Sequence, residues 1–583
     1  MKHFLFVLLF MFSNQVIGQL REIEGKIIDE STNSEIPFAN VQNRSLKKGT
    51  ISNADGFFKI PFEKWTDTIW IHAVGFKSQR LTLDEKTGFY WVKMQESITE
   101  LGEVMVTPNE NIQLFHLLEA CRKNPNKIKQ EAKAYYELKT HIDDKQVELV
   151  EGFFNVGLSG YELSGQELKA GRIAMHTYDE QMRMFVSAES SKAILLSRVM
   201  NETDYFPLSP LSMNFKKMRR GFYLNTDRKY LDDNQDSIMV ISYLPKVRSG
   251  NYFKGKIWLN TTRNRLVKQT MNCEDCKIHP FLPLFESDSI LKVNLQITKT
   301  FGPKDGNQLF NHIDFNYEIT YKSRFGKSGE KNYLIKTSAL LYAYDYEETF
   351  FIPKFEFDKK ASDYRKIFSI PSNDFFWQYN DEYRLNDHQN SNLAFFFDPA
   401  SITNTNYCAI KDSPLKKGFF QEPYIRWSTN RIIFKESIPD SLLDRSKVGL
   451  TDRNYNLSAK VFFDVNTYRD STNIVTCAIF DPYESYYLLP IDTVTHCFIN
   501  IYFDLIEIER RKFEASLKNQ VLTREELNER YDEFIGNCDL IKEMYFKDVA
   551  HGRNERQLIK WNAFVKSELP IDNIEVFGVF KEK

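Results

Sequence analysis

The stretch "EGKIIDESTNSEIPFANVQNRSLKKGTISNADGFFKI", Glu24–Ile60, decides the fold of the N-terminal part of the chain. Apolar and polar residues alternate along it, and turn-forming residues divide it into short segments, a pattern typical of strands with one buried face. One strand is predicted from Ile23 and another from Pro37. Asp55 and Gly56 predict a tight hairpin turn, because glycine accepts the positive φ that such turns need. Short strands at this spacing predict a small β-sandwich.

The same alternation continues through "DTIWIHAVGF", Asp67–Phe76. The recurring elements are Gly25-x-Ile27-x-Asp29, Pro37-x-x-x-Val41, Gly49-Thr50-x-Ser52-Asn53-x-Asp55-Gly56-x-Phe58-x-Ile60, Asp67-x-Ile69-x-Ile71 and Gly75-Phe76. Together they resemble the carboxypeptidase regulatory-like domain, a transthyretin-like β-sandwich common in exported Bacteroidetes proteins. The resemblance implies such a domain over residues 19–106. It implies no peptidase activity, because the domain accompanies catalytic domains and has no reactive groups of its own.

The chain begins with "MKHFLFVLLFMFSNQVIGQ", which has the layout of a secretory signal peptide. Lys2 precedes the apolar run Phe4–Phe12, and a polar stretch then ends in the small residue Gly18. The run is too short to cross a bilayer, and the alternative is a buried N-terminal strand. We therefore predict a signal peptide at residues 1–18 and export to the periplasm, the outer-membrane periphery or the cell surface. No later apolar run is long enough to predict a transmembrane helix.

The composition describes a globular protein without a dominant charge. Of the 583 residues, 77 are basic and 79 acidic, so no net field attracts nucleic acid or an anionic membrane. Seven cysteines are too few for a disulfide scaffold. Cys273 and Cys276 form one C-x-x-C near His279, which offers three ligands and no second pair. A local disulfide or two free thiols is therefore expected there in preference to zinc.

The predicted fold class is multidomain and mainly β, with an α+β domain at the C-terminus. A helical linker is expected at residues 107–131 and a β-rich domain at 132–350, with a short helix at Ala188–Met200. Within the β-rich domain, "YFKGKIWLNTTRNRLVKQTM" reads as a β-hairpin. Residues 351–420 are aromatic and rich in turns, and they are predicted to form an irregular connector. The α+β domain is expected at residues 421–583.

In the C-terminal domain, "THCFINIYFDLIEIERRKFEASL", Thr495–Leu517, predicts one amphipathic helix. Apolar residues recur at three- and four-residue spacing and form a continuous stripe: Phe498, Ile501, Tyr502, Leu505, Ile508 and Phe513. Glu507 and Arg511 are predicted to pair on the polar side. A second helix is expected at Thr523–Cys538, because Thr523 followed by Glu526 forms a capping box.

The order of motifs in this domain resembles a bacterial zincin-like family of unknown function. The residues that carry the resemblance are Trp427-Ser428, Tyr502-Phe503-Asp504, Glu507, His551-Gly552, Gln557 and Trp561. The family has the motif H-E-Q-x-H-F-D on a helix, in which two histidines hold Zn²⁺ and the glutamate acts on its bound water. Aligning Phe503-Asp504 with F-D places Phe498 and Tyr502 at the histidine positions and Ile499 at the glutamate position. The resemblance thus implies a zincin-like fold whose metal motif is lost.

We therefore predict no catalytic residues, no metal and no cofactor. Tyr502, Glu507 and His551 are candidates for a residual ligand pocket. The alternative is that His551-Gly552 caps a helix or turn, while Gln557 and Trp561 pack the last helix. His496 does not restore the motif, because residue 500 at the i+4 position is asparagine.

The function expected from the sequence is binding or scaffolding in the cell envelope, without catalysis, with an envelope protein or a glycan as the partner. Two alternatives remain open. One is a zinc-dependent hydrolase with a metal site rebuilt from Glu507, His551 and a third residue. The other is an accessory protein of an outer-membrane transporter.

Overall fold

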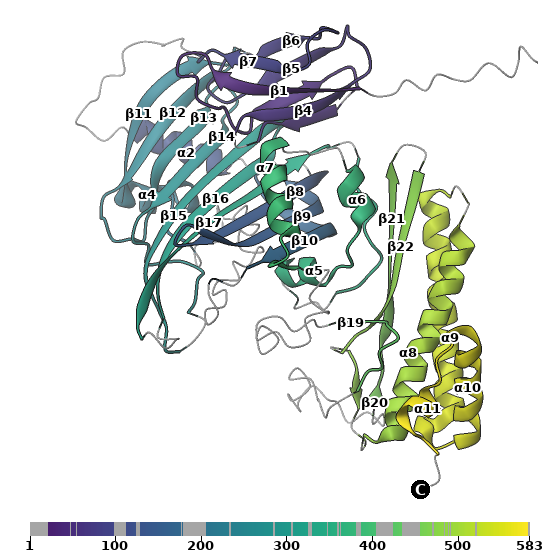
Figure 1. Cartoon of the computed structure of the whole chain (residues 1–583). Coiled ribbons are helices and arrows are strands. Elements are labelled where there is room, and N and C mark those ends of the chain that lie inside the picture. Colours follow the sequence, from purple (N-terminus) through teal and green to yellow (C-terminus); the bar gives the residue numbers. More distant parts are fainter. Residues whose placement is uncertain are drawn as a thin grey trace, which may run out of the picture. The chain divides into compact units, whose positions relative to one another are not determined.

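The computed structural model describes residues 21–97, 112–123, 129–178, 206–357, 361–380, 386–403, 424–433 and 455–580, apart from short gaps within these ranges. The predicted signal peptide and the predicted helix at residues 188–200 lie outside them. The chain forms two compact units. Unit 1 comprises residues 1–166, 174–349 and 380–401, and unit 2 comprises residues 167–173, 350–379 and 402–583. Strands dominate and the long helices belong to unit 2, which confirms the predicted fold class (Figure 1).

Unit 1 begins with the predicted β-sandwich. Its two sheets have the strand orders β4-β1-β7 and β3-β2-β5-β6. Alternate residues of each strand, such as Ile27, Val41 and Ile71, are fully buried between the sheets, as the period of two requires. The strands are β1 (Arg21–Asp29), β2 (Asn40–Asn43), β3 (Lys48–Ile51), β4 (Phe57–Phe62), β5 (Thr68–His72), β6 (Gln79–Thr82) and β7 (Tyr90–Met94).

Two details of the sandwich differ from the prediction. Strand β2 begins at Asn40 and not at Pro37, because Phe38 has a φ of 57° that is incompatible with a strand. Gly56 does have the predicted positive φ, 79°, and its N–H donates to Asn53 O at 3.0 Å. However, β3 pairs with β2 whereas β4 pairs with β1. The turn therefore connects strands of different sheets and does not close a hairpin.

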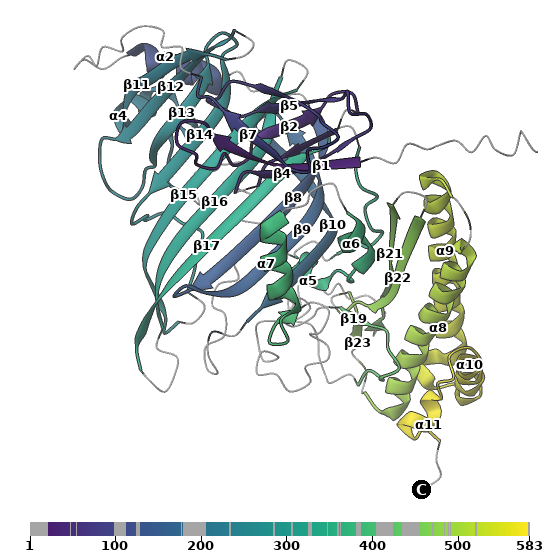
Figure 2. The ribbon, with the colours of Figure 1, turned by 45° about the horizontal axis from the view of Figure 1, so that its top comes forward.

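A large antiparallel sheet makes up most of the remaining part of unit 1, as predicted for the β-rich region (Figure 2). Its order is β11-β12-β13-β14-β15-β16-β17-β8-β9-β10-β18. The predicted hairpin is β13 with β14, and Ile257 pairs with Gln269 across it. The strands are β8 (Lys129–Ile142), β9 (Lys145–Ser159), β10 (Glu162–Met175), β11 (Phe222–Leu231), β12 (Ser237–Pro245), β13 (Lys254–Asn260), β14 (Arg265–Cys273), β15 (Ser289–Lys304), β16 (Asn307–Ser323), β17 (Lys331–Tyr344) and β18 (Ile402–Thr403).

Short helices occur in two further stretches of the chain, of which residues 350–379 belong to unit 2. The predicted linker contains α2 (Ile112–Lys123), which packs near α4 (Phe215–Gly221). The expectation that residues 351–420 are irregular is wrong in part, because they contain α5 (Asp363–Ser369), α6 (Asp374–Tyr379) and α7 (Asn386–Phe397). Helix α6 is capped by Asn373, whose Oδ1 accepts from Phe376 N at 3.0 Å. Such short helices carry too few turns to leave a clear apolar period in the sequence.

Unit 2 is built around one long helix, α8 (Thr493–Leu517), which contacts α9, α10, α11 and β22 (Figure 1). The helix predicted at Thr523–Cys538 has the expected capping box but continues to Val549. The other elements are α9 (Arg524–Val549), a 3₁₀ turn (Ala550–Gly552), α10 (Glu555–Glu568), α11 (Asn573–Phe577), β19 (Ile425–Arg426), β20 (Tyr455–Asn456), β21 (Ala459–Tyr468), β22 (Ser471–Phe480) and β23 (Tyr486–Tyr487). None of the described helices combines the length and apolar character that a membrane-spanning helix needs.

Candidate functional site

The three positions of α8 that the zincin-like alignment singles out all lie in the core of unit 2. Phe498, Ile499 and Tyr502 are at most 1% exposed. The helix reaches this core with a regular start, because Asp492 accepts a hydrogen bond from Thr495 N at 2.7 Å as its N-cap. All six residues of the predicted apolar stripe are buried.

Phe498 is packed among aromatic rings. Its ring centroid lies 5.3 Å from that of Tyr545, 5.6 Å from that of Phe546 and 6.0 Å from that of Tyr455. The Tyr545 hydroxyl also donates to Phe498 O at 2.8 Å, so the partner ring is fixed to the backbone of α8. Offset and edge contacts at these distances stabilise a core beyond the area that they bury. The first histidine position of the motif is therefore occupied by a closed aromatic cluster.

Tyr502 is bound through its hydroxyl to the sheet of unit 2. The hydroxyl accepts from Ala459 N at 3.1 Å, and burial raises the pKa of Tyr502 above its usual value. One side of the residue nevertheless lines a cavity of about 420 Å³, together with Lys460, Asp539 and Lys542. Of the three residues predicted to form a residual pocket, Tyr502 lines this cavity.

His551 lies in the turn between α9 and α10. It has a φ of 62°, and Gly552 has a φ of 89°, so the pair reverses the chain as a turn. The imidazole centroid is 4.3 Å from that of Tyr455 and 6.3 Å from that of Phe498. Burial lowers the pKa of His551, which favours the neutral ring. The alternative interpretation from the sequence, a turn cap that packs on the core, describes this geometry.

Glu507 makes the predicted ion pair with Arg511, at 2.8 Å, but its surroundings differ from the prediction. The residue is 3% exposed and does not lie on a solvated face. A second guanidinium, that of Arg510, binds both of its oxygens at 2.7 and 2.8 Å. Two arginines thus hold this buried carboxylate, and their positive charges make it a poor ligand for a cation.

The three predicted pocket residues do not converge on one point. Tyr502 and His551 belong to the same aromatic cluster, because both lie near rings that also contact Phe498. Glu507 is nine residues beyond Phe498 on α8, a rise of about 13 Å. Within the described parts of the chain, no group of three or more His, Cys, Asp or Glu residues is placed to hold a metal ion.

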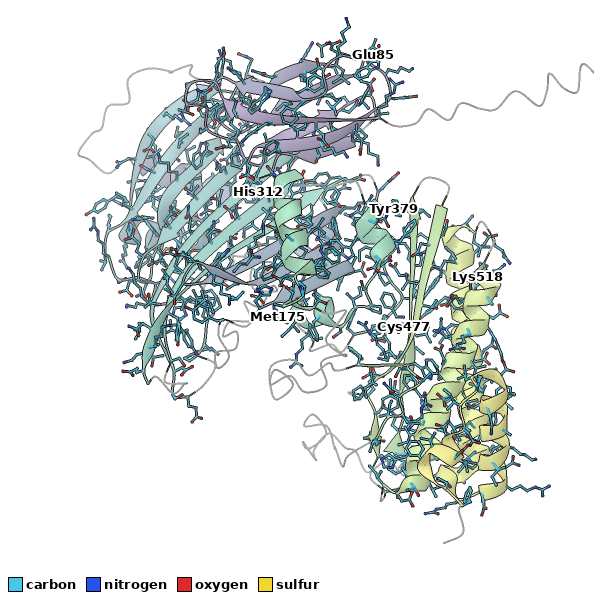
Figure 3. All side chains as sticks on the ribbon, viewed as in Figure 1. Glu85, Met175, His312, Tyr379, Cys477 and Lys518 are labelled. Atoms are coloured by element: carbon cyan, nitrogen blue, oxygen red, sulfur yellow. The ribbon has the colours of Figure 1, made fainter. Side chains whose placement is uncertain are left out.

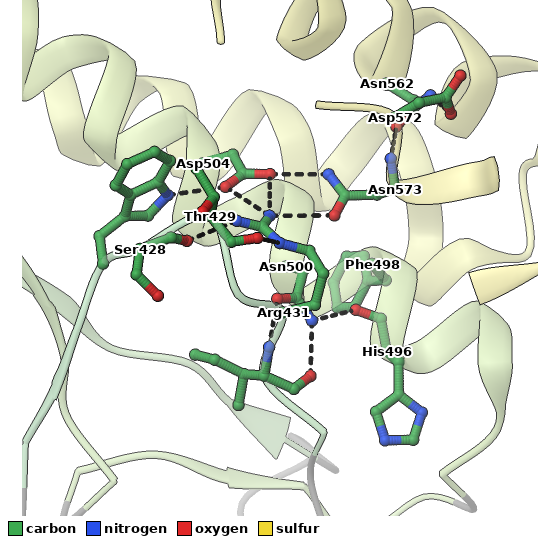
Figure 4. Close-up of polar contacts among 12 residues, drawn as sticks. Ser428, Thr429, Arg431, His496, Phe498, Asn500, Asp504, Asn562, Asp572 and Asn573 are labelled. Carbon is green, nitrogen blue, oxygen red and sulfur yellow. Dashed lines mark hydrogen bonds and ion pairs between the residues drawn. The ribbon is translucent and has the colours of Figure 1, made fainter. Parts of the chain in front are cut away.

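A buried polar network next to this core was not foreseen from the sequence (Figure 4). Asp504 is fully buried and accepts from Trp427 Nε1 at 2.8 Å and from Asn573 Nδ2 at 2.7 Å. Arg431 Nη1 lies 2.9 and 2.8 Å from its two oxygens. Asn500 extends the network by binding both backbone groups of Ile432. The network ties the segment that follows β19, and α11, to α8.

Two members of this network stand out in the sequence as landmarks of the zincin-like resemblance, Trp427 and Asp504. Their contact crosses 77 positions of the chain. No local pattern marks Arg431 as the counter-ion, because isolated arginines are common on surfaces. Both carboxylate oxygens of Asp504 accept hydrogen bonds from side chains of the network. The network therefore stabilises the fold of unit 2 and leaves no free group for a reaction.

A shallow apolar groove of about 550 Å³ lies between α9 and α10. Leu540 and Met544 line it and are 60% and 57% exposed. The groove also contains Gln557 and Trp561, the last two landmarks of the zincin-like resemblance. Trp561 packs on Tyr545 as well, with ring centroids 5.6 Å apart, as expected for a residue that packs the last helix.

A cavity of about 840 Å³ lies in unit 1, where the sandwich meets the large sheet. Phe38 of the sandwich packs against His312 of β16, with ring centroids 4.5 Å apart and the rings tilted by 39° (His312 is labelled in Figure 3). Ser97 Oγ donates to Leu231 O at 3.1 Å, also across this junction. A concave site of this size with several converging polar side chains is the usual setting of a ligand site.

A β-bulge shapes the floor of this cavity. Thr300 pairs with His312 and Phe301 with Phe310, so Asn311 is the extra residue of β16. A bulge interrupts the alternation of faces and redirects side chains, and here Asn311 and His312 both line the cavity. Asn311 is 7% exposed, and no hydrogen bond of the described residues uses its side-chain amide. His312 is bonded to Thr300 through Nδ1, while its Nε2 is buried without a partner in the described structure.

Two charged groups lie beside the bulge on the same face of the sheet. Lys268 and Thr300 are paired in register, as are Thr298 and Asp314, so all four side chains share the face of His312. Burial raises the pKa of Asp314 to about 6 and lowers the pKa of Lys268. Burial also lowers the pKa of His312 to about 3. Titratable side chains whose pKa values are shifted often cluster in the cavities of functional sites.

The Asp314→Asn variant should be more stable than the parent protein at neutral pH. The pKa of Asp314 is raised from 3.8 to about 6 on folding, so the carboxyl favours the folded state below pH 3.8 and loses that contribution as the pH rises through 6. Removing the charge should therefore add about 2 kcal/mol to the unfolding free energy at pH 7.5 and little at pH 4. Urea unfolding at both pH values measures this difference.

The exposed Asp275→Asn variant is the control and should change stability by less than about 0.5 kcal/mol at either pH. A loss of stability in Asp314→Asn at pH 7.5 would show that the carboxylate is held by partners and is not exposed to a cavity.

Comparison with known families identifies one part of the chain. Residues 23–106 match the family model of the CarboxypepD_reg-like domain. The N-terminal sandwich is assigned to that domain type. The match covers the strands of the sandwich and does not extend to the large sheet or to unit 2. No curated protein matches the chain.

Several solved structures show a remote similarity to this protein. One is a domain described as an outer membrane lipoprotein-sorting protein from Vibrio parahaemolyticus, 12% identical, covering 40% of this chain and 92% of its own, with a TM-score of 0.18. A LolA superfamily protein from Nitrosomonas europaea is 13% identical, covers 40% of this chain and 90% of its own, and has a TM-score of 0.16. The MucA/MucB complex of Pseudomonas aeruginosa contributes a chain that is 9% identical, covers 39% and 91%, and has a TM-score of 0.14. TM-scores this low do not establish a shared fold.

Proposed function

We propose that this chain is an exported, non-catalytic binding or scaffolding protein of the cell envelope, which recognises an envelope protein or a glycan. The packing of Phe498, Ile499 and Tyr502 into the core of unit 2 is the observation that carries the proposal. If unit 2 has a zincin-like fold, the positions that would bind the metal are occupied by side chains packed in its hydrophobic core. Export is supported by the layout of residues 1–18 and by the CarboxypepD_reg-like match.

Binding is supported by two surfaces of the described chain. The cavity of unit 1 offers unpaired polar groups, as a ligand site does. The groove of unit 2 exposes Leu540 and Met544, and exposed apolar patches of this kind mark protein contacts.

The alternative of a rebuilt hydrolytic metal site has little support. Glu507 is held by two arginines, whereas His551 lies against Tyr455 and Phe498, about 13 Å away along α8. A transporter accessory is the other alternative, and affinity purification from envelope extracts that recovers a transporter would favour it.

We expect the purified full-length chain to cleave neither casein nor a mixed peptide library, with or without a zinc chelator. Glu507→Ala and His551→Ala should behave like the parent protein, because neither residue is placed to act on a metal-bound water. Fluorescence release over several hours provides the measurement. Cleavage that the chelator abolishes, and that either variant loses, would establish the hydrolase instead.

A further inference from the structure

We propose that the cavity of unit 1 binds a short neutral saccharide, held by Lys268, Asn311 and Asp314. The inference rests on the proposed function, since it names the ligand class of a binding protein and the residues that hold the ligand. Three observations lead to it. They are the bulge that directs Asn311 into the cavity, the opposite charges of Lys268 and Asp314, and the pairing of strands β14, β15 and β16 on both sides.

Asn311 is the first of these observations. The residue is 7% exposed and lines the cavity, and its amide, which carries two donors and an acceptor, meets no partner in the described chain. The β-bulge places it there, because regular alternation would have turned one of Asn311 and His312 to the other face. The amide is therefore available to hydrogen-bond a polar ligand.

The charges of the cavity floor decide what kind of polar ligand fits. No hydrogen bond or ion pair of the described residues reaches Lys268 Nζ, which lies 5.2 Å from the centroid of Trp258. Asp314 receives one hydrogen bond, from Asn316 Nδ2 at 3.1 Å. One cation and one anion cancel, so the floor favours neither an anionic nor a cationic ligand. At the rim, Arg263 and Asp236 neutralise each other at 2.6 Å.

Vicinal hydroxyl groups of a sugar can hydrogen-bond both charged side chains of the cavity floor. Each hydroxyl donates one hydrogen bond and accepts two, so neighbouring hydroxyls can accept from Lys268 and donate to Asp314. The Asn311 amide can do both. Phe38, Phe76 and Tyr230 line the same cavity and provide rings for the apolar face of a sugar. At about 840 Å³, the cavity is large enough for several sugar rings.

Other ligand classes fit less well. A peptide that binds as an added strand needs an unpaired sheet edge, but β14, β15 and β16 are each paired on both sides. A nucleic acid or an anionic glycan needs a cluster of cations without counter-charge. A lipid chain could contact the apolar walls but would leave Lys268, Asn311 and Asp314 of the floor without a polar partner.

The test is calorimetric titration of the full chain with neutral tetrasaccharides of glucose, mannose, xylose and N-acetylglucosamine. Comparators are a sulfated tetrasaccharide and an uncharged tetrapeptide. At least one neutral saccharide should bind, and Asn311→Ala and Lys268→Met should each weaken it by about tenfold or more. Lys336→Met, on the exposed surface of β17, is the matched control and should bind like the parent protein.

Each outcome decides the proposal. Failure of all neutral saccharides to bind the folded chain overturns it, and so does saccharide binding that neither cavity variant weakens. Binding of the peptide or of the sulfated sugar alone, lost in the same variants, overturns the ligand class and leaves a binding function intact. Chromatography of the titrated sugar distinguishes failure of the proposed function, because a hydrolysed saccharide would show catalysis.

Discussion

The Arg431→Met variant should lose about 3–5 kcal/mol of the unfolding free energy of unit 2. Asp504 is fully buried, and Arg431 supplies its only positive counter-charge among the described residues. Methionine fills the space of the arginine stem but leaves the carboxylate with two neutral donors, Trp427 and Asn573. Arg431 also donates to Ser428 O at 2.7 Å, so the segment that follows β19 loses an internal hydrogen bond.

Urea unfolding followed by far-ultraviolet circular dichroism reports on unit 2, which contains the long helices. The control is Lys512→Met, which removes the exposed ion pair between Lys512 and Glu509 on α8. It should lower the unfolding free energy by less than about 1 kcal/mol. Adding Asp504→Asn to Arg431→Met should recover part of the loss, because the uncompensated charge is then gone. A single Arg431→Met variant as stable as the Lys512→Met control would show that the network is not needed for folding.

The sequence alone predicts local structure in unit 2 well. The apolar stripe of α8 is visible because its residues repeat with the helical period, and a stripe that wide must face a core. The capping box at Thr523 is likewise a local pattern. Glu507 shows the limit of such reasoning, because its charge indicates a solvated face, whereas Arg510 and Arg511 make its burial tolerable.

Features that depend on contacts between distant segments of the chain could not be predicted from the sequence. Asp504 and Arg431 are 73 positions apart, and only the folded core brings them together. The bulge at Asn311 depends on the register between β15 and β16, and the alternation of β16 alone does not show where it is interrupted. The cavity of unit 1 is lined by the sandwich and by the large sheet. The sequence indicates these two parts separately and gives no sign that they contact each other. Of the predicted pocket residues, Tyr502 could be anticipated as a cavity residue, but its neighbours could not.

Placing an H-E-x-x-H motif on α8 should unfold unit 2. The triple variant Phe498→His, Ile499→Glu and Tyr502→His replaces two core aromatic rings by smaller imidazoles whose polar nitrogens would be buried, at about 2–4 kcal/mol for each replacement. It also places a carboxylate where Ile499 is 1% exposed, which costs several kcal/mol more. The sum is comparable with the whole stability of a typical domain, about 5–15 kcal/mol. Far-ultraviolet circular dichroism should show loss of the helical signal at 25 °C.

A matched control separates burial from histidine chemistry. Leu540 and Met544 have the same four-residue spacing on a helix but are exposed. The double variant Leu540→His and Met544→His should therefore keep the helical signal of the parent protein. If the triple variant on α8 also stays folded and takes up zinc, Phe498 and Tyr502 border an open site and not a core.

The zinc content of the parent protein tests the central claim most directly, that Phe498, Ile499 and Tyr502 form a packed core of unit 2 and not a metal site. The full chain is incubated with zinc, dialysed, and measured by elemental analysis alongside Glu507→Ala and His551→Ala. We predict no stoichiometric zinc in any of the three proteins. One tightly bound zinc per parent chain, lost in both variants, would contradict the account.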